Sequence, residues 1–314
     1  MLSINSTAIP AVREMIDRRD ELGIAVAEQE NGATCIDCGV NVPGSYRAGT
    51  LFVEVCLAGL ATAAITMGRV GDIPVPFLHL AIEHPALACL GSQKAGWVLK
   101  AGDYSAMASG PARALALKPK ETYNRIGYRD TSRTGILALE ADTLPDEKVT
   151  EFIAEKCGIG PEDLYVLVAP TRSLVGSVQI SGRVVTATLH KLEEKGYDVR
   201  LIRHAAGRSP VAPVKRSGID AMGTTNDCNI YYGSVSLVAE GYDPVFATLP
   251  SRTSPDYGRP FGRVLKDAGY DFLKVDSLLA FSPAEVTVND STSGEVYHFG
   301  GLNRDVLLES FGVL

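Results

Sequence analysis

The middle of the chain alternates apolar runs with segments of helical spacing, and this alternation limits the possible folds more than any other feature. Apolar runs occupy residues 135–141, 164–170 and 197–202, and helical patterns occupy 146–157 and 174–194 between them. A glycine follows each helical segment, where a helix C-cap belongs. Strands that alternate with helices pair in parallel through right-handed crossovers by default. The region therefore predicts a β-α-β-α-β block.

Two hairpins are expected, one near each end of the chain. The dipeptide Asn31-Gly32 separates two short apolar runs, as a tight turn does. Residues 291–294 form a polar turn between possible strands at 285–290 and 295–299. Helical spacing predicts further helices at about 6–22, at 46–60 and from about 303.

These patterns together predict an α+β fold with mixed α and β layers. A chain of 314 residues, of which 46% are hydrophobic, can bury enough apolar surface for two domains. We expect a discontinuous domain A at 1–62 plus 205–314 and a domain B at 63–204, with the ligand pocket between them.

The composition excludes several classes of protein. A net charge of −7 gives the chain no overall attraction for nucleic acid. No apolar run reaches the roughly 18 residues that a membrane-spanning helix needs, and the N-terminal segment lacks a signal-peptide core. We therefore expect a cytoplasmic protein with no membrane or nucleic-acid partner.

The six cysteines fit reduced, buried thiols, and the single C-x-x-C at Cys35 and Cys38 is weak support for a zinc or redox site, so we predict no metal.

Two glycine-rich runs, 88–97 and 107–118, combine small hydroxyl residues with a cation. Backbone amides with Lys94 or Arg113 could hold a phosphate or carboxylate at a helix N-terminus. The alternative is a pair of tight turns with solvated cations. Neither run matches a nucleotide-binding fingerprint, so the sequence leaves both interpretations open.

The helix expected after Pro170 begins where a strand ends, which is the usual place for ligands in α/β sheets. Arg183, Thr186 and His190 are spaced three and four apart and share one helix face. An arginine among apolar neighbours either reaches a partner in a pocket or extends to solvent. The polar segment 222–234 could hold a heterocycle or could be a capped turn that satisfies its own backbone.

Seven motifs, in the same order along the chain, resemble those of the methenyltetrahydromethanopterin cyclohydrolases. They are ENGATCIDCGVNVPGSYRAG, PALACLGSQKAGW, MASGPARALALKPKE, LPDEKVTEFIA, APTRSLVGSVQISGRVV, MGTTNDCNIYYGS and PAEVTVND. The resemblance implies a hydrolase of one-carbon metabolism and methanogenesis that interconverts the methenyl and 5-formyl forms of tetrahydromethanopterin. It further implies a homotrimer that binds the pterin between two domains and uses water but no metal or other cofactor.

The resemblance also assigns residues. Gln93, Lys94 and Ala95 would face the reacting carbon, and Arg183 would orient water and keep a nearby glutamate ionised. Further contacts with the substrate are expected from Ser92, Ser109, Arg113, Thr171 and Asn226.

The chain departs from the family at the position of the catalytic glutamate, which is Thr186 here. Loss of an acid-base group typically costs about 10²–10⁴-fold in rate. Thr186 could position water while Glu140 or Glu83 acts as base, the enzyme could be slow, or the chain could be a pterin-binding paralogue. Because a buried guanidinium needs a partner, we expect an anion, water or acidic group beside Arg183. A second departure, Arg172, either alters ligand recognition or is solvated.

Overall fold

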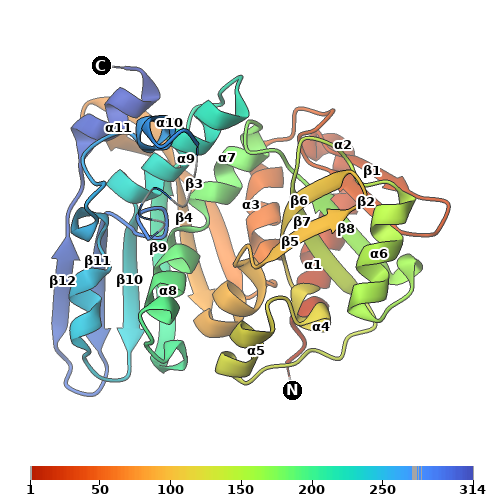
Figure 1. Ribbon diagram of the computed structural model, residues 1–314, viewed down its shortest axis with the longest axis horizontal. Helices are drawn as coiled ribbons and strands as arrows, with labels where there is room; N and C mark the ends of the chain where they lie inside the picture. Colours follow the sequence, from red (N-terminus) through yellow and green to blue (C-terminus); the bar gives the residue numbers. More distant parts are fainter. Residues whose placement is uncertain (1, 271–273, 275, 277, 314) are drawn as a thin grey trace. The chain divides into compact units, whose positions relative to one another are not determined.

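The structure is a computed structural model that describes residues 2–270, 274, 276 and 278–313. The chain forms two compact units, Met1–Thr62 with Ala86–Gly176 and Ala63–Pro85 with Ser177–Leu314. Among the described residues each unit contains one six-stranded mixed sheet (Figure 1). The α+β prediction is confirmed.

The sheet of the first unit has the strand order β1-β2-β8-β7-β6-β5. β2, β8 and β7 pair in parallel, and the other neighbours are antiparallel. The strands are β1 (Ala25–Glu28), β2 (Thr34–Asp37), β5 (Trp97–Ala101), β6 (Tyr104–Ser109), β7 (Gly135–Glu140) and β8 (Leu164–Val168). The helical segments are α1 (Ile4–Asp17), α2 (Arg19–Leu22), α3 (Tyr46–Cys56), the π-helix η1 (Ala86–Gln93), α4 (Arg113–Ala116), α5 (Lys120–Ile126), α6 (Glu147–Cys157) and the 3-10 turn η2 (Pro161–Asp163).

Both faces of this sheet carry an apolar core, because its central strands β7 and β8 are mostly apolar on both sides. On β7, Ile136 and Ala138 join a cluster with residues of α1 and α3, while Leu137 and Leu139 join a cluster with residues of α6. Successive strand residues point to opposite faces, so one continuous apolar run supplies two cores. Full burial of each large aliphatic side chain stabilises the fold by about 1.5–3 kcal/mol.

The sheet of the second unit has the order β12-β11-β10-β9-β4-β3. β10 and β11 are parallel, whereas β4 with β9, β9 with β10 and β11 with β12 are antiparallel. The strands are β3 (Ala61–Val70), β4 (Ile73–Glu83), β9 (Ile202–Pro210), β10 (Ser234–Ala239), β11 (Glu285–Asp290) and β12 (Val296–Gly300). The helices are α7 (Leu174–Ser181), in which the chain passes from the first unit to the second, α8 (Val184–Glu194), α9 (Gly218–Tyr232), α10 (Phe261–Asp267) and α11 (Arg304–Phe311), with 3-10 turns η3 (Val199–Leu201), η4 (Pro244–Thr248) and η5 (Ser251–Thr253).

The core of the second unit lies between α9, α10, α11 and the sheet. Cys228, Ile230 and Tyr231 of α9 cluster with Phe261 of α10 and Leu307 of α11. α8 packs on β9, where Gly207 leaves room for the side chains of Val184 and Val185. These contacts fix the direction of α8, which begins just after Arg183 and carries Thr186.

Several predicted elements are confirmed. Both hairpins are present, as β1–β2 and β11–β12, and β7-α6-β8 is a parallel β-α-β unit. The N-terminal helix and the helix at 46–60 correspond to α1 with α2 and to α3, and the closing helix is capped by Asn303 as expected.

The rest of the predicted β-α-β-α-β block is wrong. Residues 199–201 form a 3-10 turn, and the strand that follows, β9, pairs antiparallel in the other sheet. The helix expected over 174–194 is interrupted at Gly182 and Arg183.

The division into two units also differs from the predicted domains, except near residue 62. The two terminal hairpins lie in different sheets, because β2 pairs with β8 whereas β11 pairs with β10. The expected discontinuous domain assigned both hairpins to one sheet-bearing domain, and local sequence patterns do not report which distant strand is the partner.

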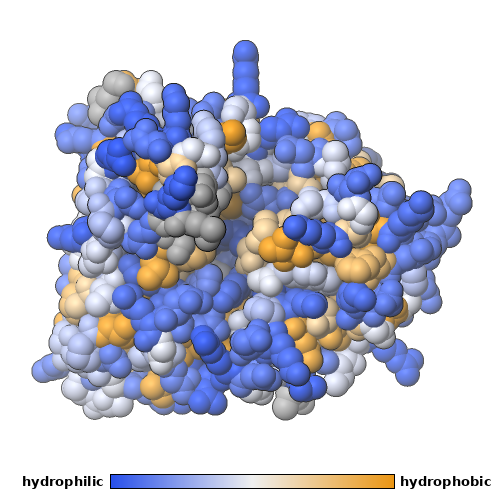
Figure 2. Space-filling view, in the orientation of Figure 1, coloured by the Kyte–Doolittle hydropathy of each residue, from blue (hydrophilic) through white to orange (hydrophobic). Residues whose placement is uncertain are grey.

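The face shown in Figure 2 is mostly hydrophilic, with apolar patches scattered over it. Within the described part of the chain, no helix has the length and apolar character required to cross a membrane.

Candidate active site

The residues Gln93, Lys94 and Ala95 lie at the carboxyl end of the π-helix η1. The N–H of Lys94 donates to the carbonyl of Cys89 at 2.7 Å, which closes the wide final turn. Gln93 is 1% exposed, whereas Lys94 and Ala95 are half-buried. Short π-helical turns are frequent at functional sites. Lys94 follows the last residue of this helix, so it does not lie at the N-terminus of η1, where the anion-binding alternative would need a cation.

Arg113 supports this π-helix from within the first unit. Its side chain is fully buried, Nη1 donates to the carbonyls of Ser92 at 2.9 Å and Leu90 at 3.3 Å, and Nε donates to that of Lys118 at 2.8 Å. A Cβ at Gly96 would collide with the guanidinium, so only glycine fits there. The alternative of a solvated cation is wrong for Arg113. Of these three bonds, two join η1 and the third joins the carbonyl of Lys118, and contact of Arg113 with substrate stays a prediction.

Ser92 and Ser109 are buried beside the same support. Ser92 Oγ donates to the carbonyl of Cys56 at 2.6 Å, and its own carbonyl accepts from the N–H of Gly110 at 2.9 Å. Ser109, at the end of β6, is 2% exposed. The contacts of Ser92 hold the backbone just before Gln93, so Ser92 is placed to position that residue. Contact of either serine with substrate stays a prediction.

Arg183 lies in the second unit at the break between α7 and α8, in the N-cap position of α8. Its Nε donates to Oε1 of Gln179 at 2.9 Å. Asn229 of α9 donates from Nδ2 to the carbonyl of Ile180 at 2.9 Å and holds the end of α7. Gln179 was not among the residues predicted from the sequence, although its spacing of four residues from Arg183 could have identified it. This neighbour of the arginine is a neutral amide, and the expected anion, water or acidic group beside Arg183 stays a prediction.

Thr186 is the third residue of α8 and is 4% exposed. One turn of helix separates it from Arg183, so both side chains lie near the same helix end. A carboxylate at this position would be favoured by the N-terminal charge of the helix. A buried neutral threonine supplies no such charge and no base near neutral pH.

Thr171 and Glu140 meet where two parallel strands end. Glu140 ends β7, Thr171 follows β8, and the Thr171 hydroxyl donates to Oε1 of Glu140. Both are at least partly shielded, since Thr171 is 9% exposed and Glu140 is half-buried. Glu83 is different: its side chain is 67% exposed and pairs with Nδ1 of His204 at 3.0 Å. Of the two alternative bases, Glu140 has the more enclosed surroundings.

Asn226 lies on α9, because the segment 222–232 is continuous helix and not the capped turn that was considered. Its Nδ2 donates to the carbonyl of Met222 at 2.8 Å. The hydroxyl and amide side chains of this segment therefore point in different directions around the helix. Only those on one side of α9 can contact the same ligand.

The C-x-x-C pair has the properties of core thiols. Cys35 and Cys38 are free and buried, and burial raises the pKa of Cys35 to about 11 and that of Cys38 further. Metal binding and disulfide exchange need thiolates, which burial disfavours here.

Among the described residues the side chains of His190, Glu193 and Glu194 bring potential ligand atoms within 4.8 Å of one another, and an i, i+4 ion pair between His190 and Glu194 explains much of this proximity.

Arg172 forms an ion pair with Asp142, 2.9 Å between Nε and Oδ1, and both side chains are exposed. A surface pair of this kind contributes about 0–1 kcal/mol. The alternative of a solvated cation at Arg172 therefore has structural support.

Comparison with known proteins agrees with the motifs. A family model described as Cyclohydrolase (MCH) matches residues 3–311. A methenyltetrahydromethanopterin cyclohydrolase from Methanospirillum hungatei is 49% identical over the whole of both chains. Proteins of the same name from Methanocaldococcus jannaschii and Methanothermobacter marburgensis are each 48% identical, over 99% of both chains and over the whole of both chains, respectively. The chain is therefore a member of the methenyltetrahydromethanopterin cyclohydrolase family.

Proposed function

We propose that this protein interconverts 5,10-methenyltetrahydromethanopterin plus water and 5-formyltetrahydromethanopterin. The observation that carries the proposal is the match to the cyclohydrolase family over residues 3–311, together with identities near half to relatives of that name. We further propose that it acts as a homotrimer without a cofactor, and a monomeric mass in solution would contradict the trimer.

The reaction needs little from the protein beyond placement and proton transfer. Water adds to the electrophilic methenyl carbon and loses one proton, which leaves a neutral hydroxyl adduct. The hydroxyl then gives up its proton as the formyl C=O bond forms, the bond from that carbon to N10 breaks, and N10 takes up a proton. The overall change is addition of water and release of one proton. Positioning of reactants and general acid-base catalysis are the effects that accelerate such a step.

The helix end at Arg183 is suited to positioning water but lacks a base at Thr186. Gln179 fixes Nε of Arg183 and so limits the orientation of the guanidinium. Thr186 can hold a water by its hydroxyl but cannot accept its proton. We therefore expect a rate about 10²–10⁴-fold below that of a protein with a carboxylate at this position.

Glu140 is the better supported substitute base. Its carboxylate accepts from Thr171 at the carboxyl end of parallel strands, where ligands of open sheets commonly bind. Glu83 instead pairs with His204 on an exposed surface, where neither charge is desolvated. Replacement of Glu140 should therefore lower turnover, and replacement of Glu83 should not.

A pterin-binding paralogue without efficient turnover is the second candidate. The observation that favours it is the buried, uncharged Thr186 next to Arg183. A binder of this kind would retain saturable affinity for the methenyl compound while leaving its absorbance unchanged.

The test is loss of methenyltetrahydromethanopterin absorbance with the wild-type protein, a no-enzyme control and the matched variants Glu140→Gln and Glu83→Gln. The proposal expects turnover above the control, 5-formyltetrahydromethanopterin as product, and a loss of about 10²-fold or more in Glu140→Gln only. Binding without turnover would support the paralogue, and neither binding nor turnover would reject both functions. Equal losses in both variants would reject Glu140 as the base.

A further inference from the structure

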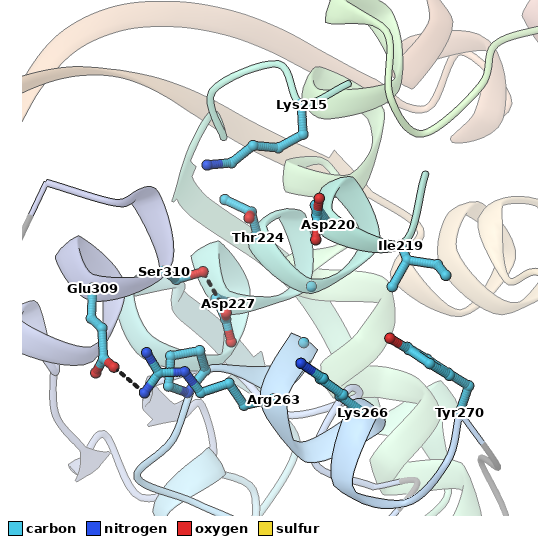
Figure 3. Close-up of a pocket in the computed structure, with 13 residues that line it drawn as sticks. Lys215, Ile219, Asp220, Thr224, Asp227, Arg263, Lys266, Tyr270, Glu309 and Ser310 are labelled. Carbon is cyan, nitrogen blue, oxygen red and sulfur yellow. Dashed lines mark hydrogen bonds and ion pairs between the residues drawn. The ribbon is translucent and has the colours of Figure 1, made fainter. Parts of the chain in front are cut away.

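The second unit contains a polar cavity of about 380 Å³ next to α9, α10 and α11 (Figure 3). Its lining includes Lys215, Asp220, Thr224, Arg263, Lys266 and Tyr270. The cavity is within the size range of small-molecule sites, which starts near 300 Å³. None of its lining residues is Arg183, Thr186 or Asn226, so it is separate from the residues assigned to the reaction.

Part of the charge in this cavity already has a partner. Arg263 pairs with Glu309. The fully buried Asp227 accepts from the N–H of Phe261 at 2.9 Å and from Oγ of Ser310 at 2.6 Å. These bonds join the three helices. They also mean that the carboxylates of Asp227 and Glu309 already have partners within the protein.

Two groups of the lining are left without a protein partner. Thr224 is 5% exposed, and its hydroxyl forms no hydrogen bond with any other described residue. Its neighbours on α9 behave differently, because Thr225 Oγ1 donates to the carbonyl of Ala221 at 2.8 Å and Asn226 bonds that of Met222. Lys266 is exposed at the mouth of the cavity and, within the described ranges, its ammonium group has no ion pair or hydrogen bond to the protein, so it is available to a ligand. The Thr224 residue is buried, but its hydroxyl oxygen is not enclosed by protein and opens to the cavity. A water or a ligand in the cavity can therefore supply its hydrogen-bond partner.

The available groups favour an anion that also carries hydroxyls. Lys266 and Lys215 supply two ammonium groups, although Lys215 also donates to the carbonyl of Phe311 at 3.2 Å. The hydroxyls of Thr224 and Tyr270 add donors from two further directions (Figure 3). Ammonium and hydroxyl groups together suit the oxygens of a phosphate group, which lysine binds as a point charge. Asp220 adds a carboxylate that can accept hydrogen bonds from ligand hydroxyls.

We propose that this cavity is a second ligand site that binds a small phosphate monoester with hydroxyl groups on its organic part. The cavity exceeds the size of inorganic phosphate, so the phosphate lies near the lysines while the hydroxylated part extends toward Asp220. The site does not depend on turnover, so its test is independent of the cyclohydrolase reaction.

The experiment is calorimetric titration of the full-length protein with glycerol 3-phosphate, inorganic phosphate and glycerol. The variants are Lys266→Gln and Thr224→Val, with Lys195→Gln as the matched charge control, since Lys195 is exposed and outside the cavity lining. Circular dichroism and the free energy of unfolding verify that each variant is folded.

The proposal expects saturable binding of glycerol 3-phosphate to the wild type and to Lys195→Gln, and affinity at least tenfold weaker for Lys266→Gln and for Thr224→Val. Glycerol alone should not bind, and inorganic phosphate should bind more weakly. No binding of glycerol 3-phosphate, unchanged affinity in both cavity variants, or equal affinity for inorganic phosphate would overturn it.

Discussion

Arg113 in the first unit and Arg183 in the second are both predicted site residues, but their surroundings give them different roles. Arg113 is fully buried and donates to three backbone carbonyls. Arg183 is half-buried at a helix break and its Nε bonds a neutral amide. A cation that is bound to carbonyls supports a backbone, whereas one at a partly open helix end can respond to substrate. Residue type alone did not separate these roles.

The largest expected effect is on stability, from Arg113→Met. This change removes donors from buried carbonyls of the π-helix and should lower the free energy of unfolding by about 4 kcal/mol. Urea denaturation measures it. Arg172→Met, which removes a cation from an exposed ion pair, is the control and should cost less than about 1 kcal/mol. Similar costs for both would contradict the supporting role of Arg113.

The opposite pattern, a large loss of turnover with a small loss of stability, is expected for Arg183→Met. Turnover should fall by about 10²-fold, because the proposed role of the guanidinium is to position and stabilise the reacting groups. Its cost in the free energy of unfolding should be near 1 kcal/mol, since the group is only half-buried. Steady-state rates and urea denaturation of the same sample provide both values. A variant that unfolds readily but keeps its turnover would invert the comparison.

A smaller effect is expected at Asp227, where burial raises the pKa from 3.8 to about 7. Asp220, Arg263, Lys266, Lys215 and Glu309 also line its cavity, and Glu309 raises this pKa further. Because the folded state holds the proton more tightly than the unfolded state, this group lowers stability as pH rises from about 4 to 7.

Asp227→Asn keeps an acceptor for Phe261 and removes this titration. We expect the wild type to lose about 2 kcal/mol more stability between pH 5 and pH 8 than the variant does, at about 1.4 kcal/mol per pKa unit. Asp267→Asn, on an exposed carboxylate of α10, is the control. Parallel pH profiles for wild type and Asp227→Asn would contradict the raised pKa.

Local patterns predicted the parts of the fold that depend on local interactions. Both hairpins, the β7-α6-β8 unit and the closing helix follow from turn residues, alternation and caps. The third strand of the predicted block failed because β9 gains its partners, β4 and β10, from distant parts of the chain. The break before α8 is marked in the sequence only by Gly182.

The candidate site was predicted mainly through motif resemblance. Spacing predicted that Arg183 and Thr186 share one face within a helix over 174–194, whereas the structure puts them at the start of α8, after a break. The spacing of residues could not distinguish the π-helix at Gln93 from a loop. The segment ALACLGSQ is mostly small residues and has no regular pattern of large apolar side chains that would reveal a helix. Nor could spacing reveal that Thr171 bonds Glu140, since that contact depends on the pairing of β7 with β8.

The most direct test of the account is the rate of methenyltetrahydromethanopterin hydrolysis by Thr186→Glu relative to wild type. The control is Thr66→Glu, which adds the same charge on an exposed position of β3. We predict that Thr186→Glu, with its carboxylate one turn from Arg183, is faster than wild type by about 10²-fold or more, and that the control is unchanged. A folded Thr186→Glu variant that is no faster than wild type would contradict the claim that this chain retains the family site without its base.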